Sequence, residues 1–266
     1  MSLLGSVRRG PDLKPPRIVV YGSHGIGKSS LAAHAPDPIL IDIEGGSDEI
    51  GVARFPVASS FFDVIEQISA LLKDEHGFKT LIVDSADWLE KLVWKETAAR
   101  LKVKSIEDVP FGKGYLEAEN EWRRALRGFD MLREKKGMSI IILAHTAIRR
   151  YDDPSSDPYD RNQIALHKAA SALVQEWADA VLYYGWKVTT KVSDAGFGRR
   201  IVRGKGNGAR LIHTEERPAA LAKNRYSMPD VIEMPDSPEE AWAHLASHIP
   251  FFSKQVSSNE MQPVEA

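Results

Sequence analysis

The sequence of 266 residues contains no cysteine. This absence excludes disulfide bonds, thiolate-bound metal and a cysteine nucleophile, and it leaves the redox compartment open. Long apolar runs are also missing. The longest, such as residues 140–144, are far too short to span a membrane. The N-terminus lacks the apolar core of a signal peptide. We therefore expect no membrane partner and a cytoplasmic location.

A strong excess of one charge is absent too, because the formal net charge is only −2. Its distribution is uneven. Residues 230–266 hold seven acids and one lysine and carry −6, so residues 1–229 carry +4. The overall charge does not indicate a nucleic-acid-binding protein. The acidic C-terminal segment either keeps the chain soluble or competes with DNA for a basic surface.

Short apolar runs alternate with helical patterns along the chain. We expect strands at residues 17–21, 39–43, 80–83, 139–144, 178–188 and 199–203, and a tight turn at 204–208 leading into 209–213. We expect helices at residues 28–34, 88–101 and 115–136, between Ser60 and Gly77, and after Ser237. The alternation predicts an α/β fold whose mostly parallel central sheet carries helices on both faces. Antiparallel strands extend the sheet at its C-terminal edge.

The predicted organisation has four parts. A flexible N-terminal arm covers residues 1–16, the core covers 17–229, a helical extension covers 230–251 and a disordered acidic tail covers 252–266. Within the core, residues 102–114 are expected to form a loop, since they contain Pro110, Gly112 and Gly114. Residues 146–163 show no periodicity and are expected to form a mobile loop.

The most specific motif is a complete Walker A sequence that follows the first strand. The predicted phosphate-binding residues are Gly22, Ser23, His24, Gly25, Ile26, Gly27, Lys28, Ser29 and Ser30. Glycines let the backbone wrap the phosphates with its amide groups, while Lys28 neutralises the β- and γ-phosphates and Ser29 ligates Mg²⁺. No guanine-specifying Asn-Lys-x-Asp motif is present. The expected ligands are therefore ATP and Mg²⁺.

Three further candidates follow predicted strands. Asp84 ends the third strand, where a carboxylate holds Mg²⁺ through a water. Ser85 comes next, so the candidate base for hydrolysis is Glu44, at the end of the second strand, with Asp42 as the alternative. His145 follows the fourth strand. Ligands of such sheets bind at the carboxyl ends of the strands, so these residues are expected to meet the Walker A loop.

This pattern resembles the RecA-type recombinase core over about residues 17–228, and it is most similar to the small phage-encoded RecA-like single-strand annealing ATPases. The resemblance implies a RecA-like P-loop fold with Glu44 as the catalytic glutamate. It places His145 where RecA has a glutamine that senses the γ-phosphate, and it implies that Lys223 and Arg225 reach the ATP of a neighbouring subunit. Here histidine replaces glutamine, and RecA's helical N-terminal polymerisation element is missing or reduced.

The resemblance also implies partners. It places the second DNA-binding loop at residues 146–167. The candidate DNA contacts are Arg149, Arg150, Tyr151, Arg161 and Lys168. The implied partners are single-stranded DNA, further copies of the chain with ATP at their interfaces and, as an additional candidate, a single-strand-binding protein. The expected activity is a DNA-stimulated ATPase that promotes annealing or recombination, in the host cytoplasm if the chain is phage-encoded.

Two alternatives stay open at the level of the sequence. A small-molecule kinase also carries a Walker A loop, and residues 149–161 would then form its lid. A nucleotide-gated adaptor or loader would bind ATP with negligible turnover. Stimulation of hydrolysis by DNA separates the first expectation from both.

Overall fold

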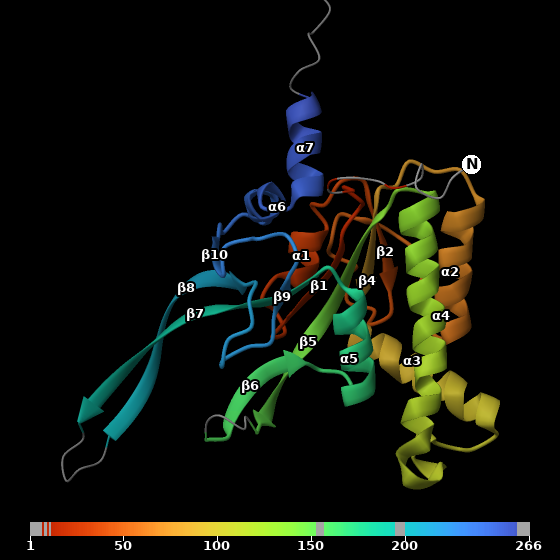
Figure 1. Ribbon diagram of the computed structural model, residues 1–266, viewed down its shortest axis with the longest axis horizontal. Helices are drawn as coiled ribbons and strands as arrows, with labels where there is room; N and C mark the ends of the chain where they lie inside the picture. The colour runs from red at the N-terminus through yellow and green to blue at the C-terminus, as the bar shows by residue number, and fades with distance from the viewer. Residues whose placement is uncertain (1–6, 8–9, 11, 153–156, 195–199, 260–266) are drawn as a thin grey trace, which may run out of the picture.

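The computed structural model describes residues 7, 10, 12–152, 157–194 and 200–259. Its centre is a sheet in which strand β1 (Arg17–Gly22) lies between β5 (Ser139–Tyr151) and β7 (Ala180–Asp194), parallel to both (Figure 1). Parallel strands continue beyond β5 in the order β4 (Thr80–Asp84), β2 (Pro38–Asp42) and β3 (Ala53–Arg54). Antiparallel strands follow β7 on the other side: β8 (Arg200–His213), then β10 (Val231–Met234), with the short β9 (Lys223–Asn224) also paired to β7. The predicted fold class is confirmed.

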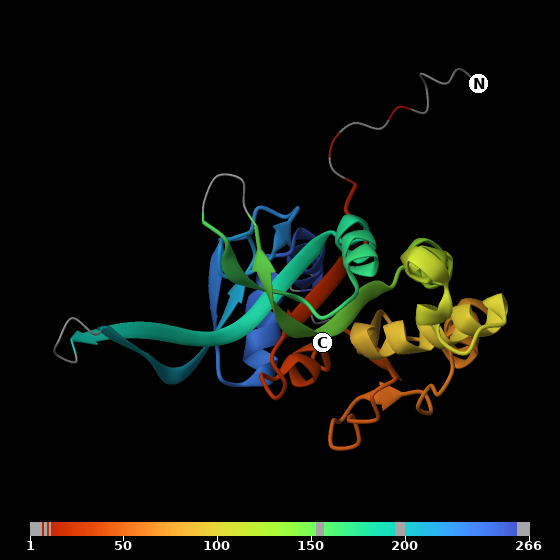
Figure 2. The same cartoon turned by 90° about the horizontal axis from the view of Figure 1, so that it is seen from below.

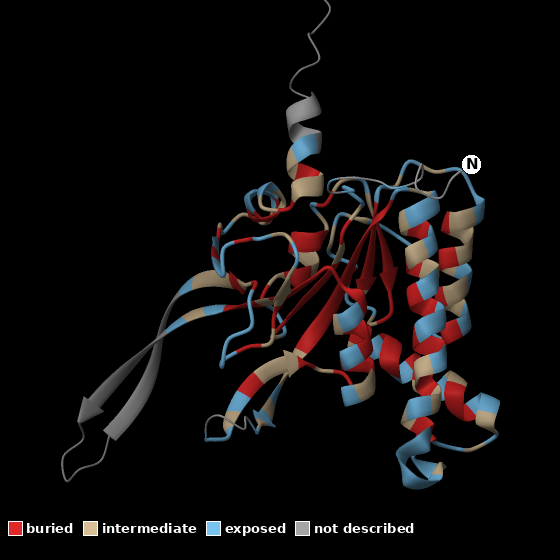
Figure 3. Ribbon diagram, viewed as in Figure 1, coloured by how far each residue is buried: buried red, intermediate tan, exposed pale blue. Residues whose placement is uncertain are grey.

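Helices cover both faces of this sheet. One face packs against α2 (Phe61–Lys73), α3 (Ala86–Leu101), α4 (Lys113–Lys135) and α5 (Lys168–Trp177). The other face packs against α1 (Lys28–Ala32) and α6 (Pro238–Ser247), with α7 (Pro250–Asn259) following. The apolar runs of the central strands, residues 18–22, 139–145 and 180–182, are buried, as their continuous apolar sequence predicts (Figure 3).

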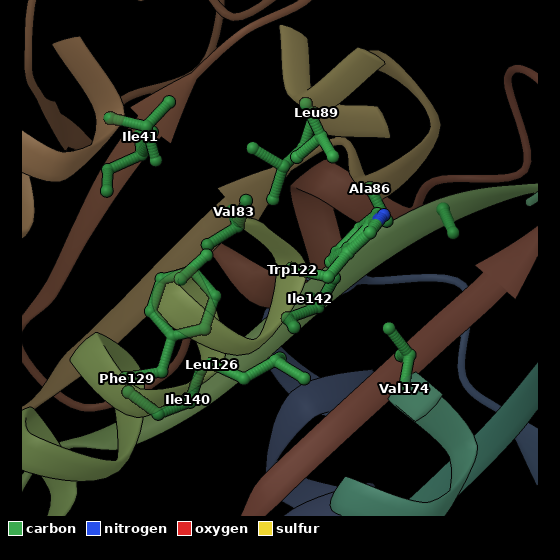
Figure 4. Close-up of a cluster of buried hydrophobic side chains, with 14 of the residues drawn as sticks. Ile41, Val83, Ala86, Leu89, Trp122, Leu126, Phe129, Ile140, Ile142 and Val174 are labelled. Carbon is green, nitrogen blue, oxygen red and sulfur yellow. The ribbon is translucent and has the colours of Figure 1, made fainter. Parts of the chain in front are cut away.

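The larger core lies under α4. Trp122 and Phe129 of this helix are fully buried and lie near Val83 of β4 and Ile140 and Ile142 of β5 (Figure 4). Trp122 and Phe129 lie on one face of α4, and Ile140 and Ile142, as alternate residues of β5, point to the same face of the sheet. Replacing such an aromatic side chain with alanine costs about 3–5 kcal/mol. This packing fixes α3 and α4, and with them the strand ends that form the site.

Residues 146–163 do not form the expected loop. Strand β5 continues to Tyr151 and pairs antiparallel with β6 (Tyr159–Ile164), in register from Thr146 opposite Ile164 to Tyr151 opposite Tyr159. We call these two paired segments, residues 146–151 and 159–164, the arm. Backbone pairing sustains it without an apolar face along its whole length, so the sequence carries no alternating pattern that would reveal its strands.

The prediction of a tight turn at residues 204–208 is also wrong. These residues lie within β8, where Gly204 pairs with Thr190 and Gly206 with Val188 of β7. Strands β7 and β8 form a long two-stranded ribbon that projects from the sheet, and both views show it (Figures 1 and 2). The expected strand start at Arg199 lies outside the described residues. Glycines predict a turn locally, but here pairing with β7 keeps Gly204 and Gly206 in the sheet, whereas Gly208, with a φ of 82°, lies at the register shift opposite Trp186 and Val188.

Smaller differences concern the loops and ends of the chain. Two 3₁₀ turns, η2 (Ile106–Asp108) and η3 (Pro110–Gly112), stand in the expected loop before α4. Residues 12–16, at the end of the predicted N-terminal segment, have no regular structure. Disorder was expected from residue 252, but α7 continues to Asn259, because buried Phe252 packs against Trp242 with ring centroids 5.5 Å apart. Residues 260–266 of the predicted tail lie outside the described part. In the described part, no helix combines the length and the apolar character needed to cross a membrane.

Candidate nucleotide-binding site

The Walker A loop connects β1 to α1 at the carboxyl edge of the sheet. Gly22 lies directly against β7: a Cβ atom there would stand 2.1 Å from the carbonyl oxygen of Tyr184. Gly25 and Gly27 have φ angles of 71° and 102°, which other residues rarely adopt. The glycine spacing of the motif is therefore required by this backbone path, whatever ligand binds in it.

Lys28 is held inside the loop. Its side chain is buried, and Nζ donates to the carbonyl oxygens of Gly22 at 3.2 Å and Ser23 at 3.0 Å. Burial lowers the pKa of Lys28, whereas the nearby carboxylates of Asp84, Asp87 and Glu44 act in the opposite direction. The ammonium group thus stands at the loop with only carbonyl partners, ready for a stronger anionic one.

Ser29 and Asp84, the two candidate magnesium ligands, are in direct contact. Ser29 Oγ donates to Asp84 Oδ2 at 2.5 Å. Burial raises the pKa of Asp84, while the hydrogen bond from Ser29 lowers it. A hydroxyl and a carboxylate are hard oxygen donors of the kind that Mg²⁺ takes, so these two residues fit that ion.

The two acids after β2 have different surroundings. Asp42 is buried, and its carboxylate accepts from Gly45 N at 2.7 Å and Ser47 Oγ at 2.5 Å, which fixes the following loop. Glu44 lines the cavity beside the Walker A loop, and the nearest hydroxyl, Ser85 Oγ, is 3.5 Å from its Oε2. Of the two, only Glu44 is free to meet a ligand.

His145 is part of a group that the sequence did not reveal. Its Nδ1 donates to Asp87 Oδ2 at 2.9 Å, and its backbone nitrogen donates to Asp87 Oδ1 at 3.1 Å. Its ring stacks on that of His24, with centroids 3.7 Å apart and planes at 20°. Burial would raise the pKa of Asp87, but the hydrogen bonds from His145 hold it below its usual value. Asp87 stands three residues after Asp84, in the first turn of α3; that spacing is the only sequence signal for it.

One cavity of about 290 Å³ joins these groups. Its lining residues are His24, Gly25, Gly27, Lys28, Ser29, Ser30, Glu44, Gly46, Ile50, Asp84 and His145. Arg210 of β8 is a further neighbour that sequence reasoning did not assign to the site. Its Nη1 lies 3.1 Å from where a Cβ of Gly27 would be, and its Nη2 donates to the carbonyl oxygen of Asp236 at 2.6 Å.

Lys223 and Arg225 lie elsewhere. Lys223 Nζ donates to the last carbonyl oxygens around the end of α5, at 2.7, 3.1 and 2.7 Å, and so closes that helix. Arg225, about half exposed, pairs with Asp179 at 3.3 Å. Asp179 also binds Arg17, at the opposite end of β1 from Gly22. Neither cation lines the cavity of its own chain.

The candidate DNA contacts also differ among themselves. Arg161 is 5% exposed, pairs with Glu216 and lies 3.9 Å from the ring centroid of Tyr151, so both side chains stabilise the arm. Arg149 donates to the carbonyl oxygen of Leu166 at 2.7 Å. Arg150 and Lys168 are exposed. The prediction that Arg161 faces DNA therefore disagrees with its burial.

A Walker A loop between a strand and a helix, with Lys28, Ser29 and Asp84 around one cavity, defines a P-loop nucleotide-binding protein. The chain belongs to the AAA domain family, which it matches over residues 14–226.

Two individual proteins are similar to it. The SPbeta prophage-derived uncharacterized protein YorG of Bacillus subtilis (strain 168) is 26% identical over 172 residues, which cover 62% of this chain and 49% of that protein. The match thus spans about half the length of that relative. Among solved structures, the crystal structure of the RadB recombinase aligns with a TM-score of 0.46 and 14% identity, covering 90% of this chain and 93% of that one.

Proposed function

We propose that this protein is an ATPase that binds single-stranded DNA and promotes annealing or recombination as an oligomer. The observation that carries the proposal is the convergence of Lys28, Ser29, Asp84 and Glu44 on one cavity. The prophage origin named for YorG agrees with a phage-type role.

The chemistry follows from the positions of these side chains. Lys28 neutralises the phosphates that the loop amides bind. Ser29 directly and Asp84 through a water would hold Mg²⁺, which would supply positive charge to the phosphates. Glu44 orients the attacking water as general base. His145 stands beside Glu44 and would report the presence of the γ-phosphate to the arm that continues from it.

A groove next to the site supports the DNA partner. It has a volume of about 480 Å³, and its lining includes Trp88, Trp94 and three lysines, Lys91, Lys95 and Lys104. Lys91 Nζ lies 3.5 Å from the ring centroid of Trp88, and Trp88 is exposed to solvent. Aromatic faces with interleaved cations bind single strands by stacking on bases and pairing with phosphates.

The groove is also coupled to the nucleotide cavity through the backbone. Ile43 lines the groove and directly precedes Glu44, while Trp88 directly follows Asp87. DNA in the groove would therefore bear on both segments that carry the hydrolytic groups. This arrangement supports hydrolysis that responds to DNA.

The decisive experiment measures ATP hydrolysis and DNA binding together. We expect single-stranded DNA to stimulate hydrolysis by the full chain, and Trp88→Ala to weaken DNA binding while leaving ATP binding intact. Trp186→Ala, which removes another exposed tryptophan on β7, is the matched control and should bind DNA as wild type does. Hydrolysis without any DNA binding would favour a kinase, and ATP binding without turnover would favour an adaptor.

Oligomerisation is tested through the cations that lie away from the cavity. We propose that Lys223 and Arg225 act on the ATP of a neighbouring subunit. Arg225 is the residue to replace, because Lys223 also closes α5 and its loss would disturb the fold. Arg225→Ala and Glu44→Gln should each lower DNA-stimulated turnover, and mixing them should restore part of it. Full activity of Arg225→Ala, or no recovery in a mixture shown to exchange subunits, would contradict action between subunits.

A further inference from the structure

Three potential metal ligands converge beside the Walker A loop. His24 comes from the loop itself, Glu44 from the segment after β2, and His145 from β5. One ligand atom from each lies within 4.8 Å of the others. The three residues are distant in sequence, so it is the fold that brings them together.

Asp87 determines which nitrogen of His145 is available. Because the ionised Asp87 accepts the Nδ1 proton at 2.9 Å, the other nitrogen, Nε2, carries a lone pair when the ring is neutral. A carboxylate behind a histidine in this way is the usual second shell of a metal-binding imidazole, since it fixes the ring and raises its basicity.

The lone pair of Nε2 faces another anion. Glu44 Oε2 lies 3.9 Å from Nε2. The ring of His24 stacks on the same imidazole, with centroids 3.7 Å apart. Because an imidazole nitrogen binds a metal in the plane of its ring, the exposed His24 ring must turn out of this stack for both histidines to bind one ion. The two imidazoles and the carboxylate are then a set of donors that a single cation in the middle would bring together.

We propose that His24, Glu44 and His145 bind one divalent transition-metal ion of the Zn²⁺ class, with an open coordination position toward the nucleotide cavity. Two imidazoles and one carboxylate form a ligand set of zinc sites that retain an exchangeable position. The site differs from that of Mg²⁺, because Ser29 and Asp84 offer only oxygen. The open position would hold a water or a phosphate oxygen.

This inference goes beyond the proposed function, and its test needs neither ATP nor DNA. The full chain, freed of metal with a chelator and then dialysed, is titrated with Co²⁺ while its visible absorption is recorded, and with Zn²⁺ by calorimetry. We expect one ion per chain and the visible bands of Co²⁺ bound to nitrogen. His24→Ala and His145→Ala should each abolish the bands.

Asp87→Asn separates ligands from their support. It should lower Zn²⁺ affinity by about 10- to 100-fold while keeping one ion per chain, as loss of a second-shell carboxylate does. His34→Ala and Glu49→Gln are matched controls, because both residues are exposed, and they should bind as wild type does. Thermal unfolding of each variant without metal identifies any that fail to fold; Glu44→Gln then serves as a second ligand variant.

A different pair of histidines provides the sharpest contrast. His244 and His248 lie one turn apart on and just after α6, with ring centroids 5.1 Å apart, and could bind Zn²⁺ at the surface. Loss of binding in His248→Ala, with binding retained in folded His24→Ala and His145→Ala, would overturn the proposal. So would the absence of any Co²⁺ bands in the wild-type protein.

Discussion

The Walker A edge of the sheet and the arm use their charged residues in different ways. At the edge, Lys28 is buried with carbonyl partners only, and Glu44 faces a cavity, so both retain capacity for a ligand. In the arm, Arg161 is buried as well, but its charge already pairs with the carboxylate of Glu216 and its guanidinium lies over the ring of Tyr151, even though its Nε lacks a hydrogen-bond partner among the described residues. A buried charge is therefore a candidate for function where it faces a cavity and no opposite charge already pairs with it.

Replacing Lys28 tests the edge most severely. Lys28→Ala should abolish ATP binding, because the phosphates lose their main side-chain cation, while the fold persists since only two hydrogen bonds to carbonyls are lost. Calorimetry with ATP measures the effect, and circular dichroism checks the fold. Unchanged ATP affinity in the folded variant would contradict a phosphate-binding role.

The next largest effect is expected at Glu44. Glu44→Gln keeps the shape of the side chain and removes its basicity, so turnover should fall by about 100-fold or more with ATP binding retained. Steady-state hydrolysis and calorimetry measure the two quantities.

Asp42→Asn is the matched control for Glu44. It should mainly loosen the loop that Asp42 fixes through Gly45 and Ser47. The main effect should therefore be a lower free energy of unfolding, with a smaller effect on turnover of bound ATP. If Glu44→Gln keeps wild-type turnover while Asp42→Asn is stable but inactive, then Asp42 is the base and Glu44 is not.

The sequence predicted the edge well because its signals are local. Apolar runs marked β1, β2 and β4, and the glycines of the Walker A loop are needed by the backbone of the loop itself. Ser60 was expected to cap a helix, and its Oγ accepts from Asp63 N at 3.1 Å. In these cases a residue and its neighbours in sequence determine the structure.

The arm and the ribbon were missed because their structure depends on partners distant in sequence. Gly204 and Gly206 favour a turn by themselves, and only pairing with β7 keeps them extended. The contacts of His145 with His24 and Asp87 likewise join three elements that nothing in the local sequence connects. The roles of Lys223 and Arg225 between subunits stay predictions, as do the DNA contacts.

Glu90 joins the two regions and introduces a pH dependence. This buried residue of α3 accepts the backbone N–H of His167, the N-cap residue of α5 after the arm, with both carboxylate oxygens 3.0 Å away. Burial raises the pKa of Glu90 to about 7, although that hydrogen bond and Arg149 act against the rise. The folded chain thus retains a proton that the unfolded chain loses near the usual glutamate pKa of 4.5.

The free energy of unfolding should therefore fall as the pH rises from about 4.5 to about 7, by up to about 3 kcal/mol from this group. Glu90→Gln keeps an oxygen for His167 N and removes the titration, so its stability should depend less on pH over that interval. Urea unfolding at several pH values compares the two. Parallel pH profiles for variant and wild type would show that Glu90 titrates alike in both states.

Arg161 is expected to matter for the stability of the arm. Arg161→Ala removes a charged hydrogen bond to Glu216 and the contact with Tyr151, and should cost about 2 kcal/mol. Urea unfolding measures this loss. A stable Arg161→Ala variant with strongly weakened DNA binding would restore the original expectation that this residue faces DNA.

The smallest effect is expected at Arg150, which the arm exposes to solvent. Its pair with Asp152, 3.3 Å long, is exposed on both sides, so Arg150→Ala should change stability by less than about 0.5 kcal/mol. If the exposed arm follows a DNA strand, the variant should lose one phosphate contact. The slope of log affinity against log salt concentration would then decrease by about 0.7, with only a modest loss of affinity at any one salt concentration.

Arg123→Ala is the matched control, because Arg123 is also exposed and also pairs with an acid, Glu119, at 3.2 Å, but on α4. Fluorescence anisotropy of a labelled single strand measures both variants across a salt series. Equal slopes for Arg150→Ala and Arg123→Ala would mean that the arm leaves DNA to the Trp88 groove, and a reduced slope for Arg150→Ala alone would place the strand along the arm as well.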